Sequence, residues 1–302
     1  MGSKIKILVV VGPTASGKSD WAVKLARRFN GEIISADSRQ VYQGMDIGTG
    51  KITRKEMGGI SHYLLDVASP KSTFTVSKYK KLAGQAIKKI GQKGKLPIVV
   101  GGTGFYIQSI VDNVVWPAVP PDKSLRKNLE KKSAAELFKI LKKYDRQRAK
   151  TIDAKNSRRL VRAIEIAASL GKVPKLKKPP SAYDFLQIGI KTDFARLKKK
   201  IEARLQKRLK KRMLAEVKKL KQSGLSWAKL DSFGLEYRYL ARYLRGQFTK
   251  AEMFSQLKTA IVQYAKRQMT WFKKDKRIVW VEKLELASKL SKNFLLGNPA
   301  SK

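Results

Sequence analysis

Short apolar runs alternate with segments of helical periodicity over the first hundred residues. Residues 5–11 form a continuous β-branched run that ends at Gly12-Pro13, which is typical of a strand buried on both faces of a parallel sheet. Further strands are predicted at residues 32–35, 63–67 and 97–100, with helices at 18–29 and 77–90. Strands that alternate with helices predict an α/β fold with a parallel sheet core flanked by helices.

The pattern changes after Val111. Trp116-Pro117 and Pro120-Pro121 mark a boundary, and Pro179-Pro180 closes the segment that follows. Within it, residues 124–144 and 156–170 have helical periodicity and no strand signals. We therefore predict an all-helical insertion over residues 113–183 in a core made of residues 1–112 and 184–302.

The core resumes with a strand at residues 185–190. Residues 193–222 predict one long charged helix. Thr249, with Glu252 three residues later, predicts the start of another helix that continues to residue 273. Residues 277–281 predict a last strand.

The charge balance is far from zero. The 67 Lys and Arg residues exceed the 23 Asp and Glu residues, and the net charge is +44. Such an excess opposes compaction by self-repulsion, so it indicates a polyanionic partner or an unusual ionic environment. Residues 1–111 carry +12 and residues 122–183 carry +13, so charge alone does not locate the partner.

Composition also excludes several kinds of chemistry. The chain has no Cys and one His, His62. Disulfides, a thiol nucleophile, a zinc finger, a Ser-His-Asp triad and a multi-His metal site are therefore not expected. No apolar run reaches the ~18 residues of a membrane span. We expect a monomeric cytoplasmic protein that binds neither a membrane nor zinc.

The loop after the first strand matches G-x-x-x-x-G-K-[ST] in full. It follows a strand and opens a helix, which is the context that this phosphate-binding motif requires. The loop amides and the helix N-terminus can hold phosphate oxygens. Lys18 can reach an outer phosphate, and the Ser19 hydroxyl can bind Mg²⁺. The predicted diphosphate or triphosphate site comprises Gly12, Pro13, Thr14, Ala15, Ser16, Gly17, Lys18 and Ser19.

Two further loops follow strands at the same edge of the predicted sheet, where ligands bind in open α/β folds. Asp37 could act as a general base, bind Mg²⁺ or cap a helix, and position alone does not decide among these roles. Gln40 could hydrogen-bond an adenine edge. Residues 101–104, Gly-Gly-Thr-Gly, permit either close approach of a ligand or a tight turn. That strand ends in Gly, whereas many P-loop ATPases have an Asp there.

Four segments together resemble the bacterial tRNA dimethylallyltransferase family, also called tRNA isopentenyltransferases. They are residues 12–19, 37–49, 101–104 and 265–272, and the resemblance spans about residues 5–282. The resemblance implies transfer of the dimethylallyl group of dimethylallyl diphosphate to N6 of the adenosine 3′ to the anticodon. The tRNAs concerned read codons that begin with U, and Mg²⁺ assists. The P-loop-type core would then carry an inserted helical tRNA-binding domain.

The resemblance also implies roles for single residues. Asp37 corresponds to the general base, and Thr103 to a residue near the reacting base. Lys18 would hold the diphosphate, and an arginine would close over it. Arg204 and Arg208 lie one helical turn apart, and of the two we favour Arg208. The expected contacts to the tRNA anticodon stem-loop are Asp37, Ser38, Arg39, Gln40, Thr103, Arg126, Arg158, Arg159, Arg162, Gly234 and Tyr237. Residues 212–217 follow a pattern about four residues shorter than the usual one.

Three other functions share some of these features. A P-loop kinase would use the same loop, but it would not need residues 37–49. A relative that modifies free adenine nucleotides would not need a basic insertion. A non-catalytic RNA-binding protein would not need Lys18, Ser19 and Asp37 together.

Overall fold

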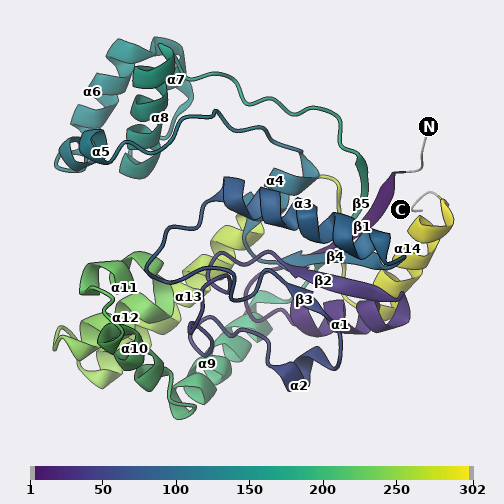
Figure 1. Ribbon diagram of the computed structural model, residues 1–302. Coiled ribbons are helices and arrows are strands. Elements are labelled where there is room, and N and C mark those ends of the chain that lie inside the picture. Colours follow the sequence, from purple (N-terminus) through teal and green to yellow (C-terminus); the bar gives the residue numbers. More distant parts are fainter. Residues whose placement is uncertain (1–3, 299–302) are drawn as a thin grey trace. The chain divides into compact units, whose positions relative to one another are not determined.

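The computed structural model describes residues 4–298, which form two compact units. The core unit joins the chain up to Asp112 to the chain from Ser181 onward, and the helical unit is Asn113–Pro180. The core unit holds one parallel sheet of six strands in the order β3-β2-β4-β1-β5-β6 (Figure 1). The strands are β1 (Ile5–Val11), β2 (Gly31–Ser35), β3 (His62–Tyr63), β4 (Leu96–Gly101), β5 (Tyr183–Ile190) and β6 (Ile278–Val281). The predicted α/β class is confirmed.

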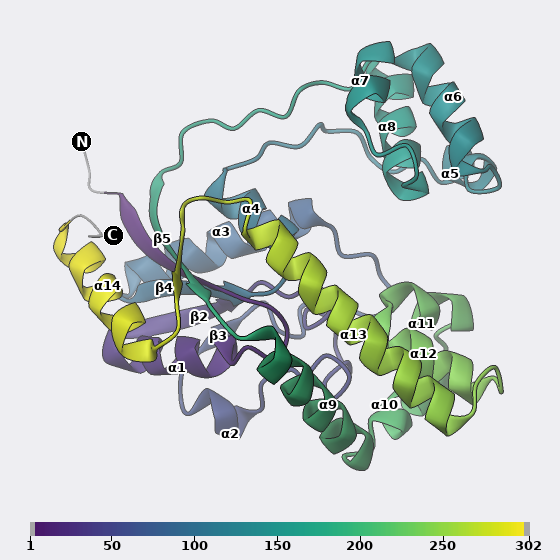
Figure 2. The same ribbon diagram turned by 180° about the vertical axis from the view of Figure 1, so that it is seen from behind.

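Helices cover both faces of this sheet, because its strands are apolar on both sides. On one face α1 (Lys18–Arg28) and α14 (Leu284–Leu296) pack against Leu8, Val10 and Ile188. The other helices of the core unit, apart from one short helix, share a second apolar core that begins on the opposite face and extends away from the sheet (Figures 1 and 2). These are α3 (Val76–Gln92), α4 (Gly104–Val111), α9 (Phe194–Lys210), α10 (Met213–Gln222), α11 (Trp227–Phe233), α12 (Leu235–Leu244) and α13 (Lys250–Phe272). A short helix, α2 (Arg54–Met57), precedes β3.

Two predicted elements were wrong in extent. The strand predicted at residues 63–67 ends at Tyr63, because Leu64 (φ 64°) and Asp66 (φ 57°) adopt left-handed backbone conformations that leave the sheet. The single helix predicted at residues 193–222 is two helices, α9 and α10. Arg212 has a φ of 67° between them, which turns the chain. By contrast, Thr249 and Glu252 form the predicted capping box of α13.

The helical unit contains α5 (Lys123–Leu129), α6 (Ala134–Tyr144), α7 (Arg146–Thr151) and α8 (Ser157–Leu170). Its predicted helix at residues 124–144 is interrupted, because Ser133 and Glu136 form a capping box that starts a new helix. Leu137, Leu141 and Leu160 lie at the centre of its small apolar core.

One buried carboxylate of this unit accepts hydrogen bonds from two arginines and a backbone amide. Glu165 of α8 is 2% exposed and accepts hydrogen bonds from Arg126 Nε and Nη2, both at 2.7 Å. It also accepts bonds from Arg162 Nη1 and from the amide of Asp122. Burial would raise the pKa of Glu165, but the hydrogen bonds from Arg126, from the amide of Asp122 and from Arg162, with the charge of Arg126, together lower it.

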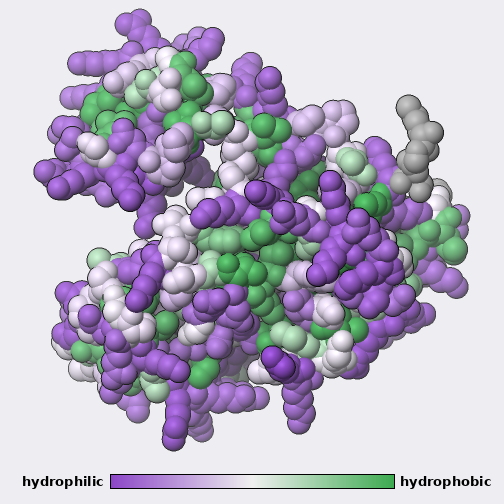
Figure 3. Space-filling model, viewed as in Figure 1, coloured by the Kyte–Doolittle hydropathy of each residue, from purple (hydrophilic) through white to green (hydrophobic). Residues whose placement is uncertain are grey.

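The exterior is strongly hydrophilic. Polar and charged side chains cover most of the face in view, with apolar patches between them (Figure 3). Among residues 4–298, no helix combines the length and the apolar character needed to cross a membrane.

Glu165→Ala should destabilise the helical unit by about 2–4 kcal/mol, because it leaves two half-buried arginines without their carboxylate. Hydrogen exchange of residues 120–166 measures this loss. Glu130→Ala removes an exposed charge from the same unit and is the control. Since the pKa of Glu165 is depressed in the folded state, its contribution is present above the unfolded pKa of about 4.3. This contribution is lost as the pH falls through the folded-state pKa. At pH 7 it is fully present, and equal protection of the mutant and the wild type there would contradict this role.

Candidate active site

The phosphate-binding motif forms a tight loop between β1 and α1. Ala15 (φ 64°) and Gly17 (φ 90°) turn the chain, and the amide of Ser16 donates to the carbonyl of Pro13 at 3.3 Å. A side chain at Gly12 would come within 2.8 Å of Ser16 Oγ, so the turn requires glycine there. Lys18 and Ser19 therefore stand at the first turn of α1, where backbone amides carry partial positive charge.

Lys18 is held close to two other cations. Its Nζ donates to the carbonyl of Pro13 at 3.3 Å. Burial, with smaller contributions from Arg204 and Arg208, lowers the pKa of Lys18 to about 8 against the opposing charge of Asp37. The free protein therefore concentrates positive charge at a point where an anion would relieve the repulsion.

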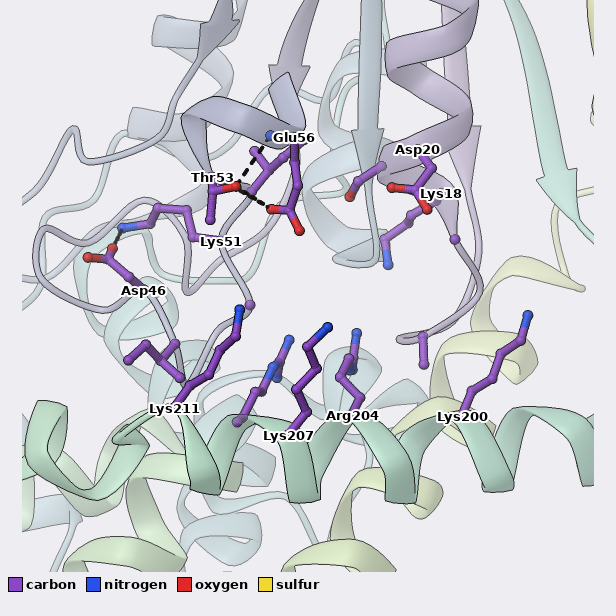
Figure 4. A pocket seen from close by; sticks show the side chains of 17 residues that line it. Lys18, Asp20, Asp46, Lys51, Thr53, Glu56, Lys200, Arg204, Lys207 and Lys211 are labelled. Carbon is purple, nitrogen blue, oxygen red and sulfur yellow. Dashed lines mark hydrogen bonds and ion pairs between the residues drawn. The ribbon is translucent and has the colours of Figure 1, made fainter. Parts of the chain in front are cut away.

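A pocket of about 470 Å³ opens beside this loop. The helix α9 forms one wall, and its basic side chains point into the pocket opposite Thr53 and Glu56 (Figure 4). The cationic lining residues are Lys18, Lys51, Lys200, Arg204, Lys207, Arg208 and Lys211. The volume and charge suit a small ligand with a multiply charged anionic group.

Arg204 and Arg208 of α9 lie one helical turn apart but have different partners. The guanidinium of Arg204 donates to Thr14 Oγ1 in the phosphate loop. Burial, with a smaller contribution from Arg208, lowers the pKa of Arg204 to about 10. Arg208 donates to the carbonyl of Gly48 and to the buried carboxylate of Glu236, both at 3.2 Å. Sequence analysis selected Arg208, whereas the direct contact with the loop belongs to Arg204.

Asp37 follows β2 and lines a second, smaller cavity of about 70 Å³. Lys18, Ser19 and Arg204 line the same cavity. Asp37 Oδ1 accepts the amides of Arg39 at 2.8 Å and Gln40 at 3.4 Å, which fixes the carboxylate. The carboxylate thus caps the turn that follows it, one of the three roles that its position allows.

The neighbours of Asp37 are tied to the protein. The amide of Ser38 donates to Thr103 Oγ1 at 3.0 Å. Arg39 Nε donates to the carbonyl of Phe233 at 2.7 Å, with its guanidinium over the Phe233 ring. The amide group of Gln40 donates to the carbonyls of residues 49 and 50. These contacts hold the loop in one conformation.

The glycines of residues 101–104 allow the protein to pack against itself. A side chain at Gly101 would come within 2.2 Å of the carbonyl of Ala36, and one at Gly104 within 2.2 Å of the Trp271 ring. The tight-turn alternative therefore explains these glycines. Thr103 begins α4 without capping it, because its hydroxyl serves the amide of Ser38 instead.

The segment at residues 46–48 is held by α10. Glu216 of that helix accepts hydrogen bonds from the amides of residues 46, 47 and 48 and from the Tyr237 hydroxyl. Tyr237 is 2% exposed and its ring lies against Gly48. The expected tRNA contact at Tyr237 is therefore a core residue here, because its ring and hydroxyl are both occupied. Gly234 (φ 75°) links α11 to α12, and a side chain there would meet no described atom within 4 Å.

The arginines predicted to contact tRNA in the helical unit fall into two pairs. Arg158 and Arg159 are exposed in the first turn of α8. Arg126 and Arg162 are half-buried and bind Glu165. Only the first pair is free of an assigned ion-pair partner among the described residues.

A Mg²⁺ ion would need ligand oxygens at this site. Within residues 4–298, no three His, Asp or Glu side chains converge as a metal site does. Mg²⁺ commonly binds one or two protein oxygens together with substrate phosphates and water. The exposed hydroxyl of Ser19 beside the cavity fits that donor set.

At the phosphate loop, sequence reasoning favoured Arg208 over Arg204 and missed Gln268. The four-residue spacing from Arg208 pointed to Arg204, but spacing could not choose between the two. Gln268 of α13 accepts the amide of Thr14 and donates to the carbonyl of Gly102, both at 2.8 Å. Only its place within the segment at residues 265–272 could have drawn attention to it.

Diphosphate affinity should fall about tenfold from pH 7 to pH 9, because Lys18 loses its charge near pH 8 in the free protein. A bound diphosphate stabilises the ammonium, so binding near pH 8 should take up a proton. Titration calorimetry in buffers of different ionisation enthalpy measures both effects. Lys18→Arg stays charged from pH 7 to pH 9, so its affinity changes only with the titration of diphosphate itself. Identical profiles of affinity against pH for the two proteins would refute this prediction.

The sequence is similar to those of known proteins over most of its length. The model of the IPP transferase family matches residues 40–275. A tRNA dimethylallyltransferase of Acetivibrio thermocellus is 41% identical over 299 residues, which are 95% of this chain and 96% of the relative. One of Anoxybacillus flavithermus is 39% identical over 282 residues, covering 92% and 90%.

Solved structures give the same result. The tRNA isopentenylpyrophosphate transferase of Bacillus halodurans has a TM-score of 0.73 and 34% identity, covering 97% of this chain and 96% of that one. A eukaryotic dimethylallyltransferase acting on tRNA has a TM-score of 0.85 and 25% identity, covering 99% and 81%. With a family match over most of its length and relatives at about 40% identity, this chain belongs to the IPP transferase family.

Proposed function

We propose that this protein is a tRNA dimethylallyltransferase. It transfers the dimethylallyl group of dimethylallyl diphosphate to N6 of the adenosine 3′ to the anticodon, in tRNAs that read codons beginning with U, and releases diphosphate. The relatives' activities support the reaction class. Because tRNA is the substrate, the enzyme acts in the cytoplasm.

One observation carries the proposal. The 70 Å³ cavity is lined at once by Lys18 and Ser19 of the phosphate loop and by Asp37. A diphosphate held by the loop and an amine next to Asp37 would therefore meet in one enclosed space. The reaction requires this proximity, since the attacking nitrogen must approach the carbon that loses diphosphate.

In the reaction, a bond forms between N6 and C1 of the allyl group while the bond from C1 to the diphosphate oxygen breaks. The proton on N6 passes to the Asp37 carboxylate. Oδ1 of Asp37 already accepts two backbone amides, and no described residue donates a hydrogen bond to Oδ2. We therefore propose Oδ2 of Asp37 as the proton acceptor.

The leaving diphosphate gains negative charge as the bond breaks. Lys18, Arg204 and the amides of the phosphate loop stabilise that charge, and Arg208 adds to the positive field. Ser19 would hold a Mg²⁺ ion, which would supply further electrostatic stabilisation. Thr103 positions the segment around Asp37 through the amide of Ser38.

The RNA interface includes the exposed first turn of α8. Arg158 and Arg159 are available to phosphates, whereas Arg126 and Arg162 hold the helix that presents them. Ser38, Arg39 and Gln40 shape the loop that receives the base, with Gly234 nearby in the chain segment that Arg39 contacts. The target base must leave its stack to enter such a pocket.

The function is tested with an anticodon stem-loop, dimethylallyl diphosphate and Mg²⁺, followed by mass spectrometry of the nucleosides. The expected product is adenosine that carries one dimethylallyl group, absent with Lys18→Ala. ATP turnover with a small acceptor and no modified adenosine would favour a kinase instead.

Asp37→Asn should lower the transfer rate by roughly 10²–10⁴-fold, because the amide cannot take the N6 proton. Its stem-loop affinity should stay within about threefold of the wild type. Single-turnover rates and filter binding measure the two quantities. Turnover that persists at saturating RNA would show that another group is the base.

Arg158→Gln and Arg159→Gln should each lower the slope of log K against log salt by about one, because each removes one phosphate contact. Their unfolding midpoints should be unchanged, since both side chains are exposed. Arg28→Gln removes an exposed charge at the far end of α1 and is the matched control. Equal slopes for all three variants would place the RNA elsewhere.

A further inference from the structure

Gln268 joins two catalytic loops through one side chain. It lies on α13 and is 6% exposed. Its Oε1 accepts the amide of Thr14 at 2.8 Å, and its Nε2 donates to the carbonyl of Gly102 at 2.8 Å. Both ends of the amide group are therefore used, one on each loop.

The fit around this amide leaves no free space. A side chain at Gly102 would come within 2.2 Å of Gln268 Nε2. Gly102 therefore lets α13 approach the loop closely enough for a direct bond. Such a contact needs a side chain that accepts at one end and donates at the other, which the amide of Gln268 does.

Each loop leads directly to one substrate of the proposed reaction. On the donor side, Thr14 also receives the guanidinium of Arg204, and Lys18 follows in the same loop. On the acceptor side, Thr103 follows Gly102 and holds the amide of Ser38, next to Asp37. Gln268 therefore links the loop of the proposed diphosphate site to the loop next to Asp37 through two hydrogen bonds.

We propose that Gln268 is a positioning residue that sets the separation between the donor loop and the acceptor loop. This inference rests on the proposed function. The residue touches neither reacting group, and it acts through the backbones of Thr14 and Gly102. A misplacement of about 1 Å between bound reactants costs about 10²-fold in rate, so the expected effect is on catalysis more than on binding.

Gln268→Met tests this, because it keeps the volume and removes both hydrogen bonds. Single-turnover transfer should fall about 10²-fold. The affinities for the stem-loop alone and for inorganic diphosphate alone should each stay within about threefold. Gln256→Met, at an exposed position on the same helix, should leave all three quantities unchanged.

Gln268→Glu supplies a second, sharper readout. The ionised carboxylate can accept from Thr14 but repels the carbonyl of Gly102, whereas the protonated carboxyl can both accept and donate. The rate relative to the wild type should therefore rise as the pH falls. Comparison at each pH removes the titration of the charged groups common to both proteins, among them Lys18 and Arg204. The same ratio for Gln268→Met should be flat.

The outcomes separate the two proposals. No transfer by the wild-type protein would refute the function itself. Transfer by the wild type together with a Gln268→Met rate within threefold of it would overturn only the positioning role. A loss of both affinities in Gln268→Met, or a flat ratio in Gln268→Glu, would assign the residue to stability instead.

Discussion

The parallel pairing of β1, β4 and β2 is the constraint on which the site depends. Val11 pairs with Gly101, and Ser35 pairs with Val100, so three strands end at one edge of the sheet. The loops that follow carry the phosphate cradle, Asp37 and Thr103. No single one of these loops carries both the phosphate cradle and Asp37. A register shift in any of these strands would separate the base from the diphosphate site, because their loops are short and bound to one another.

Polar groups buried between elements fix these loops more firmly than apolar packing could. Glu216 gathers three amides and a hydroxyl, Gln268 links two loops, and Glu165 gathers two arginines in the helical unit. Each group loses its contacts entirely if the geometry shifts, whereas apolar contacts tolerate sliding. Several motif residues are therefore explained by the loop conformation that they maintain. Gln40 and Tyr237 belong to this class as well, since their polar atoms already have partners within the core unit.

Positive charge has two different uses in this chain. At the phosphate loop, Lys18 and Arg204 are crowded together, and burial disfavours the charged form of each. That unfavourable arrangement is relieved when a diphosphate binds, so binding and leaving-group stabilisation draw on the same charges. The exposed arginines of α8 carry no such strain and suit a solvated RNA backbone. The total of +44 thus combines a few partly buried cations at the proposed diphosphate site with many basic residues elsewhere in the chain.

The sequence by itself determined the fold class, the helical insertion and the phosphate loop, because these depend on local periodicity and on a contiguous motif. It also pointed to Asp37, which follows a strand whose end could be predicted. Only the tertiary structure distinguished Arg204 from Arg208, and exposed Arg158 from Arg126, because these pairs differ in their long-range partners alone. The same holds for Gln268, whose two contacts lie 254 and 166 residues away in the chain. The ends of β3 and α9 could not be predicted from the sequence either. The chain turns there through left-handed backbone at Leu64 and Arg212, whereas a glycine is the usual sign of such a conformation.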